Sequence, residues 1–322
     1  MTRLEALALT AAAATGVQVG AAMVATRFVV HDIGPASLAF LRYAIAVLCL
    51  VPPVLMSARV RFAARDLLVV MVLGIVQFGV LIALLNLGLQ FISSTRAALL
   101  FSTFPLMTMI LAASLGREPL TRTKAAGVVL TIIGVGVALG ERLMMQNSTG
   151  EWLGALLVLA AALCGALCSV LYRPYLARYP TLPVGAWAML ASVLFLGAPA
   201  GAEGLFTDVP RLDAEGWIAV LFIGLSSGIG YVLWLWALKH ASPTKVTVFL
   251  SLSPITAALL GIWIFREPFT PGVLLGLVGV VAGLWLATRT PPILGRPTSA
   301  RSSLAIESNE GATQGDADIA GN

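Results

Sequence analysis

Polar side chains that interrupt long apolar runs are the residues of this sequence that could do chemistry. Inside an apolar helix bundle such groups are costly unless they pair, contact water or bind a ligand. A guanidinium matches a carboxylate or phosphate, while amides and aromatic rings could fix the rest of a small molecule. We expect substrate contacts from Gln18, Arg42, Tyr43, Gln77, Asn86, Tyr231 and Trp234.

Each candidate also has a structural interpretation. Arg42 lies about seven residues, or about 10 Å, from the outer end of its expected helix, so its stem could carry the guanidinium to the outer headgroups. The three amides could hydrogen-bond neighbouring helices. Tyr231 and Trp234 lie three residues apart beside small residues such as Ser227 and Gly230, which either leave room for a ligand or allow tight packing.

The composition requires lipid as the solvent of the helices that carry these residues. Of 322 residues, 59% are hydrophobic and only 11% are charged. That share of charge is too small for an ordinary water-soluble surface. Apolar runs long enough to cross a bilayer core of about 30 Å recur along the chain. We predict an all-α integral membrane protein with ten transmembrane helices, at about 4–26, 36–56, 67–90, 96–116, 122–140, 152–172, 183–202, 216–238, 244–265 and 270–288.

The basic residues are dispersed singly between these runs, so the net charge of +5 indicates orientation and not nucleic-acid binding. Most Lys and Arg residues fall in the segments that are cytoplasmic if the amino terminus is cytoplasmic. Few lie in the outer loops, and both termini are therefore expected in the cytoplasm of a cell inner (plasma) membrane protein. The polar stretch 292–322 is predicted to be a disordered cytoplasmic tail.

The chain repeats itself at a shift of 149 residues. The segment from Arg96 to Pro105 falls on the segment from Lys245 to Pro254, with the cation, a serine and the proline in register. Farther along, Arg-Glu-Pro at 117–119 falls on the same three residues at 266–268. We therefore predict one five-helix repeat over 1–145 and a second over 146–291.

Five helices is an odd number, so the second repeat must enter the membrane in the opposite sense to the first. Such inverted repeats are a recurring architecture of secondary transporters, in which two similar halves open a central site to each side alternately. The repeat therefore predicts transport by alternating access.

The repeated prolines are candidates for a hinge or cavity wall. Pro105 and Pro254 are expected near the middle of the fourth and ninth helices, where each removes a backbone hydrogen bond. Ser102 and Ser251 lie one turn before them. Matching interruptions in two repeats indicate a transport site, although a fixed kink fits the pattern equally well.

The repeated Glu-Pro-x-Thr turns at Glu118 and Glu267 have a structural explanation. Proline cannot continue the preceding helix, Thr121 or Thr270 can cap the next one, and a carboxylate is favourable at a helix amino terminus. The alternative is that the two glutamates form a gate by pairing with basic residues when one side closes.

These turns, the prolines, Arg42 and the glycines after each turn resemble the drug/metabolite transporter superfamily, specifically the two-domain EamA-type branch, over about residues 5–288. The resemblance implies export of amino acids or related small metabolites. Proton-coupled multidrug members of that superfamily carry a glutamate in the first helix, where this chain has Gln18. Coupling through a buried carboxylate is therefore not expected, because every carboxylate falls at a helix end, in a loop or in the tail.

Other functional classes remain as alternatives. One is a broad-specificity exporter of drug-like or aromatic compounds, and another is a nontransporting membrane scaffold or sensor. The sequence contains no phosphate loop, dinucleotide motif or paired acids and histidines, so we predict no enzyme, no cofactor and no metal. The expected partners are a small-molecule substrate and the lipid bilayer.

The fifth and tenth expected helices are rich in glycine. These glycines either pack the two helices against each other within one chain or form the contact of a homodimer: Gly127, Gly134, Gly276, Gly279 and Gly283.

Overall fold

The computed structural model describes residues 3–56, 60–92, 94–117, 121–143, 150–208, 210–265 and 271–288, and all regular elements in these ranges are helices. The elements from the first predicted repeat are α1 Arg3–Val29, α2 Pro35–Met56, α3 Ala64–Gly74, η1 Ile75–Val80, α4 Leu81–Phe91, α5 Ser94–Phe101, α6 Phe104–Ser114 and α7 Arg122–Leu143. Those from the second are α8 Glu151–Leu171, α9 Arg173–Arg178, α10 Thr181–Ala202, α11 Ala214–His240, α12 Pro243–Val248, η2 Phe249–Ser251, α13 Leu252–Phe265 and α14 Pro271–Thr288. The predicted tail lies outside the described residues.

Among the described residues, seven helical stretches are long and apolar enough to cross a membrane: Arg3–Val29, Pro35–Met56, Ala64–Phe91, Trp152–Arg178, Thr181–Ala202, Ala214–His240 and Pro243–Ile264. Phe104–Ser114 and Leu274–Gly283 are apolar but shorter. The chain is therefore a helical protein with multiple membrane-spanning candidates, and these apolar stretches are helical because lipid-facing backbone must satisfy its hydrogen bonds within a helix.

Some helix boundaries follow local sequence signals. Asp213 precedes α11, and its carboxylate accepts a hydrogen bond of 2.8 Å from the backbone amide of Gly216. This is the bond that an amino-terminal cap makes. Prolines at the start of α2 and α12, Pro35 and Pro243, lose nothing because amides in a first helical turn have no intrahelical acceptor.

Pro105 occupies a different place from the one we predicted, whereas Pro254 lies near the middle of the helical stretch Pro243–Ile264, as predicted. A turn at residues 102–103 separates α5 from α6, and Pro105 lies in the first turn of α6. Pro254 is the third residue of α13, directly after the short 3₁₀ segment η2. Proline fits a first turn without breaking a hydrogen bond, so the regular α-helix is interrupted just before each proline, by a turn before Pro105 and by the 3₁₀ segment η2 before Pro254.

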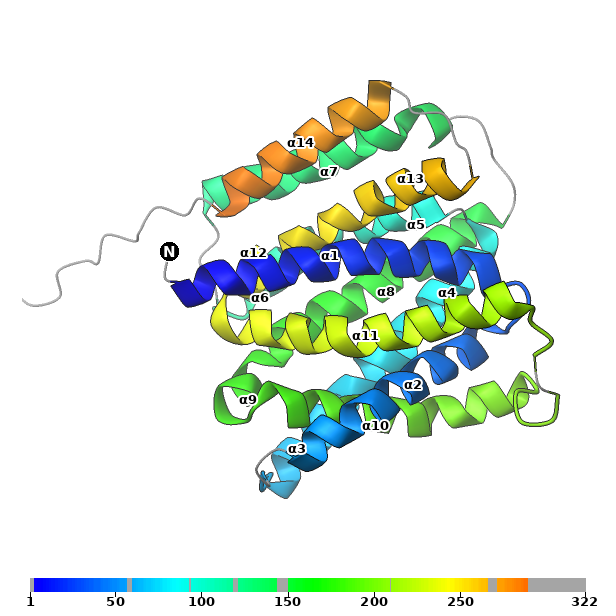
Figure 1. Cartoon of the computed structure of the whole chain (residues 1–322). Helices are drawn as coiled ribbons and strands as arrows, with labels where there is room; N and C mark the ends of the chain where they lie inside the picture. The colour runs from blue at the N-terminus through cyan, green and yellow to red at the C-terminus, as the bar shows by residue number, and fades with distance from the viewer. Residues whose placement is uncertain are drawn as a thin grey trace, which may run out of the picture. The chain divides into compact units, whose positions relative to one another are not determined.

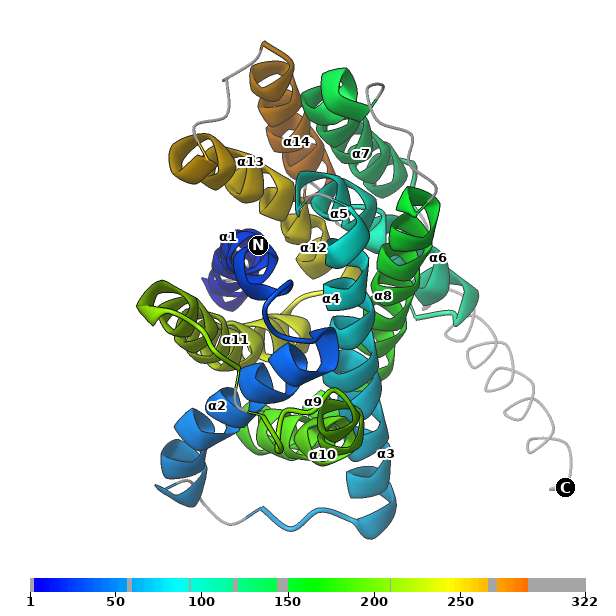
Figure 2. The same ribbon diagram turned by 90° about the vertical axis from the view of Figure 1, so that its right-hand side faces the viewer.

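Helices from the two predicted repeats interleave in a symmetric pattern (Figures 1 and 2). α1 packs along α11, and α8 packs along α4; α2 pairs with α10, and α7 with α14. By order within the repeats, α1 corresponds to α8 and α4 corresponds to α11, so exchanging the repeats converts the α1–α11 pair into the α8–α4 pair. The pairs α2–α10 and α7–α14 each join two corresponding helices and are unchanged by the exchange. α1 begins, and α8 leads into α9, at the same side of Figure 1, so α1 and α8 run in opposite directions.

Helices α7 and α14 approach each other through glycines. A Cβ atom added to Gly279 would lie 2.7 Å from the Cα of Gly134, and one added to Gly134 would lie 2.7 Å from the backbone nitrogen of Val280. Such separations are too short for side chains larger than hydrogen. These glycines therefore allow α7 and α14 to pack closely within one chain, which is one of the two roles that the sequence predicted for them.

Candidate functional site

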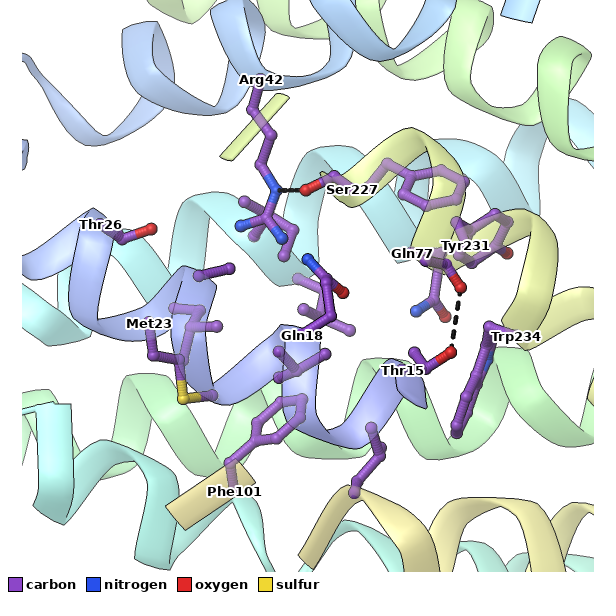
Figure 3. A pocket seen from close by; sticks show the side chains of 18 of the residues that line it. Thr15, Gln18, Met23, Thr26, Arg42, Gln77, Phe101, Ser227, Tyr231 and Trp234 are labelled. Atoms are coloured by element: carbon purple, nitrogen blue, oxygen red, sulfur yellow. Dashed lines mark hydrogen bonds between the residues drawn. The ribbon is translucent and has the colours of Figure 1, made fainter. Parts of the chain in front are cut away.

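A cavity of about 90 Å³ lies where α1, α2, η1, α4 and α11 meet, with contributions from α5, α6 and η2 (Figure 3). It brings together six of the seven predicted contact residues, from both predicted repeats: Gln18, Arg42, Tyr43, Gln77, Tyr231 and Trp234. These residues are far apart in the sequence, so the fold creates the site by packing several helices around one point.

Arg42 points inward. The residue is only 8% exposed, and its Nε donates a 2.7 Å hydrogen bond to the hydroxyl of Ser227 on α11. The guanidinium carbon lies 5.6 Å from the centre of the Tyr43 ring. Charged groups are buried only where something compensates their lost hydration. The structure thus places the guanidinium at the cavity and not among outer headgroups.

The polar wall of the cavity is built around α1 and α11. Gln18 donates a hydrogen bond of 3.2 Å to the hydroxyl of Ser226, and Thr15 donates one of 3.2 Å to the carbonyl of Gly230. A Cβ on Gly230 would lie 2.6 Å from the Gln18 side-chain oxygen, so glycine leaves the room that this amide occupies. The small residues near Tyr231 are therefore part of the cavity.

Gln77 lies in η1, a π-helical turn within the long helix that runs from α3 to α4. A π-turn inserts an extra residue per turn, changes the direction of the side chains that follow, and is frequent at functional sites. The following residue, Phe78, also lines the cavity. Sequence reasoning identified Gln77 from its polarity but could not predict the π-turn, because this turn has no simple residue signature.

Aromatic rings and aliphatic side chains form the rest of the wall. The Phe78 ring centre lies 4.8 Å from that of Tyr43 and 4.1 Å from that of Tyr231. Both pairs are edge-on, an arrangement that aromatic pairs prefer. The ring centres of Phe104 and Trp234 lie 6.2 Å apart. Phe101, Phe104 and Phe78 were missed from the sequence, although the first two flank the interruption before Pro105, which is a signal that could have indicated them.

The remaining predicted residues lie elsewhere. Asn86 is 1% exposed but does not line the cavity; its amide donates a 2.9 Å hydrogen bond to the carbonyl of Pro35 and so joins α4 to the start of α2. Our expectation of substrate contact does not match this placement, because the side chain faces a neighbouring helix. Ser102, Pro105 and Ser251 each directly follow a lining residue without lining the cavity themselves, and Pro254 does not line it either. Glu118 and Glu267 lie outside the described residues.

The cavity lies nearer to one end of the helix bundle than to the other. On α1 its lining residues run from Thr15, near the helix middle, to Thr26, close to the last residue Val29, and on α4 they continue to Leu89. The cavity therefore extends toward the end at which α1 finishes, which we call the Val29 end; the opposite end, at which α1 begins, is the Arg3 end.

Polar contacts between the predicted repeats lie at both ends. At the Arg3 end, Lys245 of α12 lies 2.6 Å from the carboxylate of Glu5 in α1, and Asp66 of α3 accepts a 2.9 Å hydrogen bond from the Tyr179 hydroxyl. At the Val29 end, the Glu203 carboxylate accepts hydrogen bonds of 3.0 and 2.7 Å from two backbone amides at the start of α2. These contacts were not predicted, because they pair residues far apart in sequence.

Comparisons with known proteins agree with this architecture. The chain is 28% identical over 273 residues to an uncharacterized transporter of Archaeoglobus fulgidus, covering 84% of this chain and 94% of the relative. It is 30% identical over 230 residues to a protein of Streptantibioticus cattleyicolor named a probable terminal-alkyne amino-acid exporter, covering 70% of this chain and 74% of that protein. A solved crystal structure of a protein 20% identical in sequence matches 92% of this chain and 99% of its own with a TM-score of 0.73, which shows a shared fold.

A family model matches the chain twice, over residues 6–140 and 152–289, and so covers most of both predicted repeats. The resemblance inferred from the repeated motifs is confirmed by this double match and by relatives named as transporters. The chain belongs to the EamA-like transporter family, consistent with membership of the drug/metabolite transporter superfamily.

Proposed function

We propose that this protein is a secondary transporter that exports amino acids or related small metabolites across the cell inner membrane by alternating access. The observation that carries the proposal is the cavity of polar and aromatic side chains that both predicted repeats enclose. Transporters built from inverted repeats bind substrate at such an interface near the bilayer midplane. One relative is named an exporter of amino acids, which favours this substrate class.

The proposed topology has ten spans in two inverted five-helix repeats, with both termini cytoplasmic. It counts α5 with α6, α7 and α14 as spans in addition to the seven long apolar stretches. The opposite directions of α1 and α8, and pairings that exchange with the repeats, support the inversion (Figure 1). In this topology the Arg3 end is cytoplasmic and the Val29 end faces outward.

The cavity volume supports a conformational cycle. An apolar cavity of about 150 Å³ can hold benzene. The cavity of this protein is smaller, at about 90 Å³. An amino acid with a sizeable side chain therefore requires the surrounding helices to separate. We assign the conformation described here to a contracted state closed at the cytoplasmic end by the Glu5–Lys245 and Asp66–Tyr179 contacts.

Transport can be tested with the full chain reconstituted in liposomes. Vesicles preloaded with unlabelled amino acid should exchange it for the radiolabelled form faster than protein-free vesicles. The control is Gly230→Leu: its added side chain fills the cavity next to the flexible end of Gln18, so exchange should fall while the helical content remains. Equal exchange by the wild type and empty vesicles, across a panel of amino acids and related metabolites, would refute the proposal.

A further inference from the structure

The charge of the cavity is unbalanced. Arg42 is the only charged side chain among the described residues that line it, and no carboxylate is included in that set. Removing one partner of a buried ion pair is strongly unfavourable because the remaining charge lacks compensation. Here one neutral hydroxyl, that of Ser227, is the hydrogen-bonding partner of the buried guanidinium. The cavity is therefore electrostatically suited to an anion.

The orientation of the guanidinium leaves donors for that anion. A guanidinium has five N–H donors, and the bond to Ser227 uses the one on Nε. In Figure 3 the two terminal nitrogens lie beyond this bond, on the side of Gln18. Nε held by a neighbouring helix fixes the plane of the group, which matters because Arg recognises anions through two parallel hydrogen bonds. Ser227 thus acts as a positioning residue for Arg42.

We propose that Arg42 is the specificity-determining residue of this cavity and that it binds the carboxylate of a small organic acid with an apolar or aromatic body. This inference rests on the proposed function and names its substrate class. A phosphate monoester carries a charge of about −1.5 to −2 at neutral pH, which one cation does not balance, whereas a carboxylate carries a single charge. The apolar body packs against Phe78, Phe104 and Trp234.

The single positive charge of the cavity also determines which substrates with basic groups can bind. Among the described lining residues the groups that could accept an ammonium are the amide oxygens of Gln18 and Gln77, the hydroxyl oxygens of the Ser, Thr and Tyr side chains, and the aromatic ring faces, all of them uncharged. An amino acid can bind through its carboxylate, but its ammonium adds little. An amine without a carboxylate would put a second cation beside Arg42, so we expect cationic drugs not to bind in this cavity.

Four compounds with one aromatic body test this inference: 3-phenylpropanoate, its neutral amide 3-phenylpropanamide, phenylalanine and 2-phenylethylamine. Their binding to the purified full chain is measured by thermal stabilisation, which rises with ligand saturation. The propanoate and phenylalanine should bind wild type at least tenfold more tightly than the amide or the amine, since a charge-assisted bidentate bond contributes about a 10- to 100-fold difference in affinity.

Variants assign the difference to one side chain. Arg42→Gln should lose the preference for the propanoate over the amide, and Arg42→Lys should keep the charge but lose the bidentate geometry and part of the preference. The control is Arg173→Gln, which removes a partly buried arginine of α9 that does not line the cavity, and should keep the full preference. Because Arg42→Gln removes a buried charge, the ligand-free variant should melt at a temperature no lower than that of the ligand-free wild type. Loss of binding by this variant can therefore be distinguished from unfolding.

Equal binding of propanoate and amide to wild type, including an absence of binding by both, would overturn the inference. So would an unchanged preference in Arg42→Gln. Failure of the proposed function gives a different result: selective binding of the propanoate without exchange in liposomes would refute transport and leave the carboxylate site standing. Rapid exchange of 2-phenylethylamine would support transport and refute the specificity.

Discussion

Replacing Glu5 with glutamine should open the cavity at the Arg3 end. The Lys245 Nζ lies 2.6 Å from a Glu5 carboxylate oxygen, and the side chains of Lys245 and Glu5 are 15% and 23% exposed, respectively. The pair joins α1 to α12 and hence one predicted repeat to the other. A transition that separates these helices must break the pair, so the substitution removes stabilisation from the closed state alone.

The free energy by which the Glu5–Lys245 pair stabilises the closed state lies between two limits. Exposed ion pairs contribute about 0.2–1 kcal/mol, and breaking a buried pair costs about 3–5 kcal/mol. A pair this short and partly buried should contribute about 1–3 kcal/mol, which is about a 5- to 150-fold change in the ratio of open to closed states. This range applies to a pair lost completely on opening.

Accessibility of the cavity from the cytoplasmic side provides the assay. A cysteine replaces Thr15 in a background whose native cysteines are substituted, namely Cys49, Cys164 and Cys168. A membrane-impermeant maleimide is then added to inside-out vesicles. Glu5→Gln should raise the labelling rate by at least about fivefold, as the lower limit above requires.

Two controls separate gating from a general loss of charge. The reversed pair, Glu5→Lys with Lys245→Glu, should restore slow labelling, since attraction does not depend on which helix carries which sign. Asp208→Asn removes an exposed carboxylate after α10 and should leave the rate unchanged. Wild-type labelling rates in Glu5→Gln, or labelling of the reversed pair as fast as in the single variants, would refute the reasoning.

Three further sets of variants test helix packing, the hinge and the ligand site. A Cβ on Gly283 would lie 2.6 Å from the backbone nitrogen of Thr131, whereas Gly136 has open space around it. Gly283→Ala should therefore destabilise the protein by about 1–3 kcal/mol and Gly136→Ala should not, a difference that thermal melting in detergent detects. Pro105→Ala and Pro254→Ala should lower liposome exchange while preserving folding, because alanine lets the interrupted helices become continuous; unchanged exchange in both variants contradicts a hinge. Trp234→Ala should weaken ligand binding by at least about tenfold through lost aromatic contact, measured by thermal stabilisation, and equal affinity would place the ligand elsewhere.

Several parts of the fold follow from local chemistry and were therefore predictable. Apolar stretches of about 20 residues indicate spans because each can be recognised without its neighbours. The glycines at 134, 279 and 283 indicated close packing because only a residue without Cβ lets helix backbones approach. Pro254 does lie near the middle of the helical stretch Pro243–Ile264. Placing Pro105 in mid-helix was wrong, because a sequence pattern does not determine whether a proline bends one helix or begins the next.

The candidate site was predictable only in part. Polarity within apolar runs identified six cavity residues, since buried polar groups require a partner wherever they lie. The same criterion included Asn86, whose partner proved to be a backbone carbonyl of α2. Phe78, Phe101 and Phe104 were missed because phenylalanine occurs on both lipid-facing and inward-facing helix surfaces, and sequence alone does not show which face a helix turns inward.

The sequence by itself determined a membrane-embedded helical protein, its two repeats and its family, because composition and repetition are properties of the chain in order. Only the tertiary structure decided that Arg42 donates a hydrogen bond to Ser227 in the wall of a cavity, and that Glu5 pairs with Lys245. Those pairs are separated by 185 and 240 residues. Their proximity depends on how α1, α2, α11 and α12 pack, and packing is a property of all the helices together.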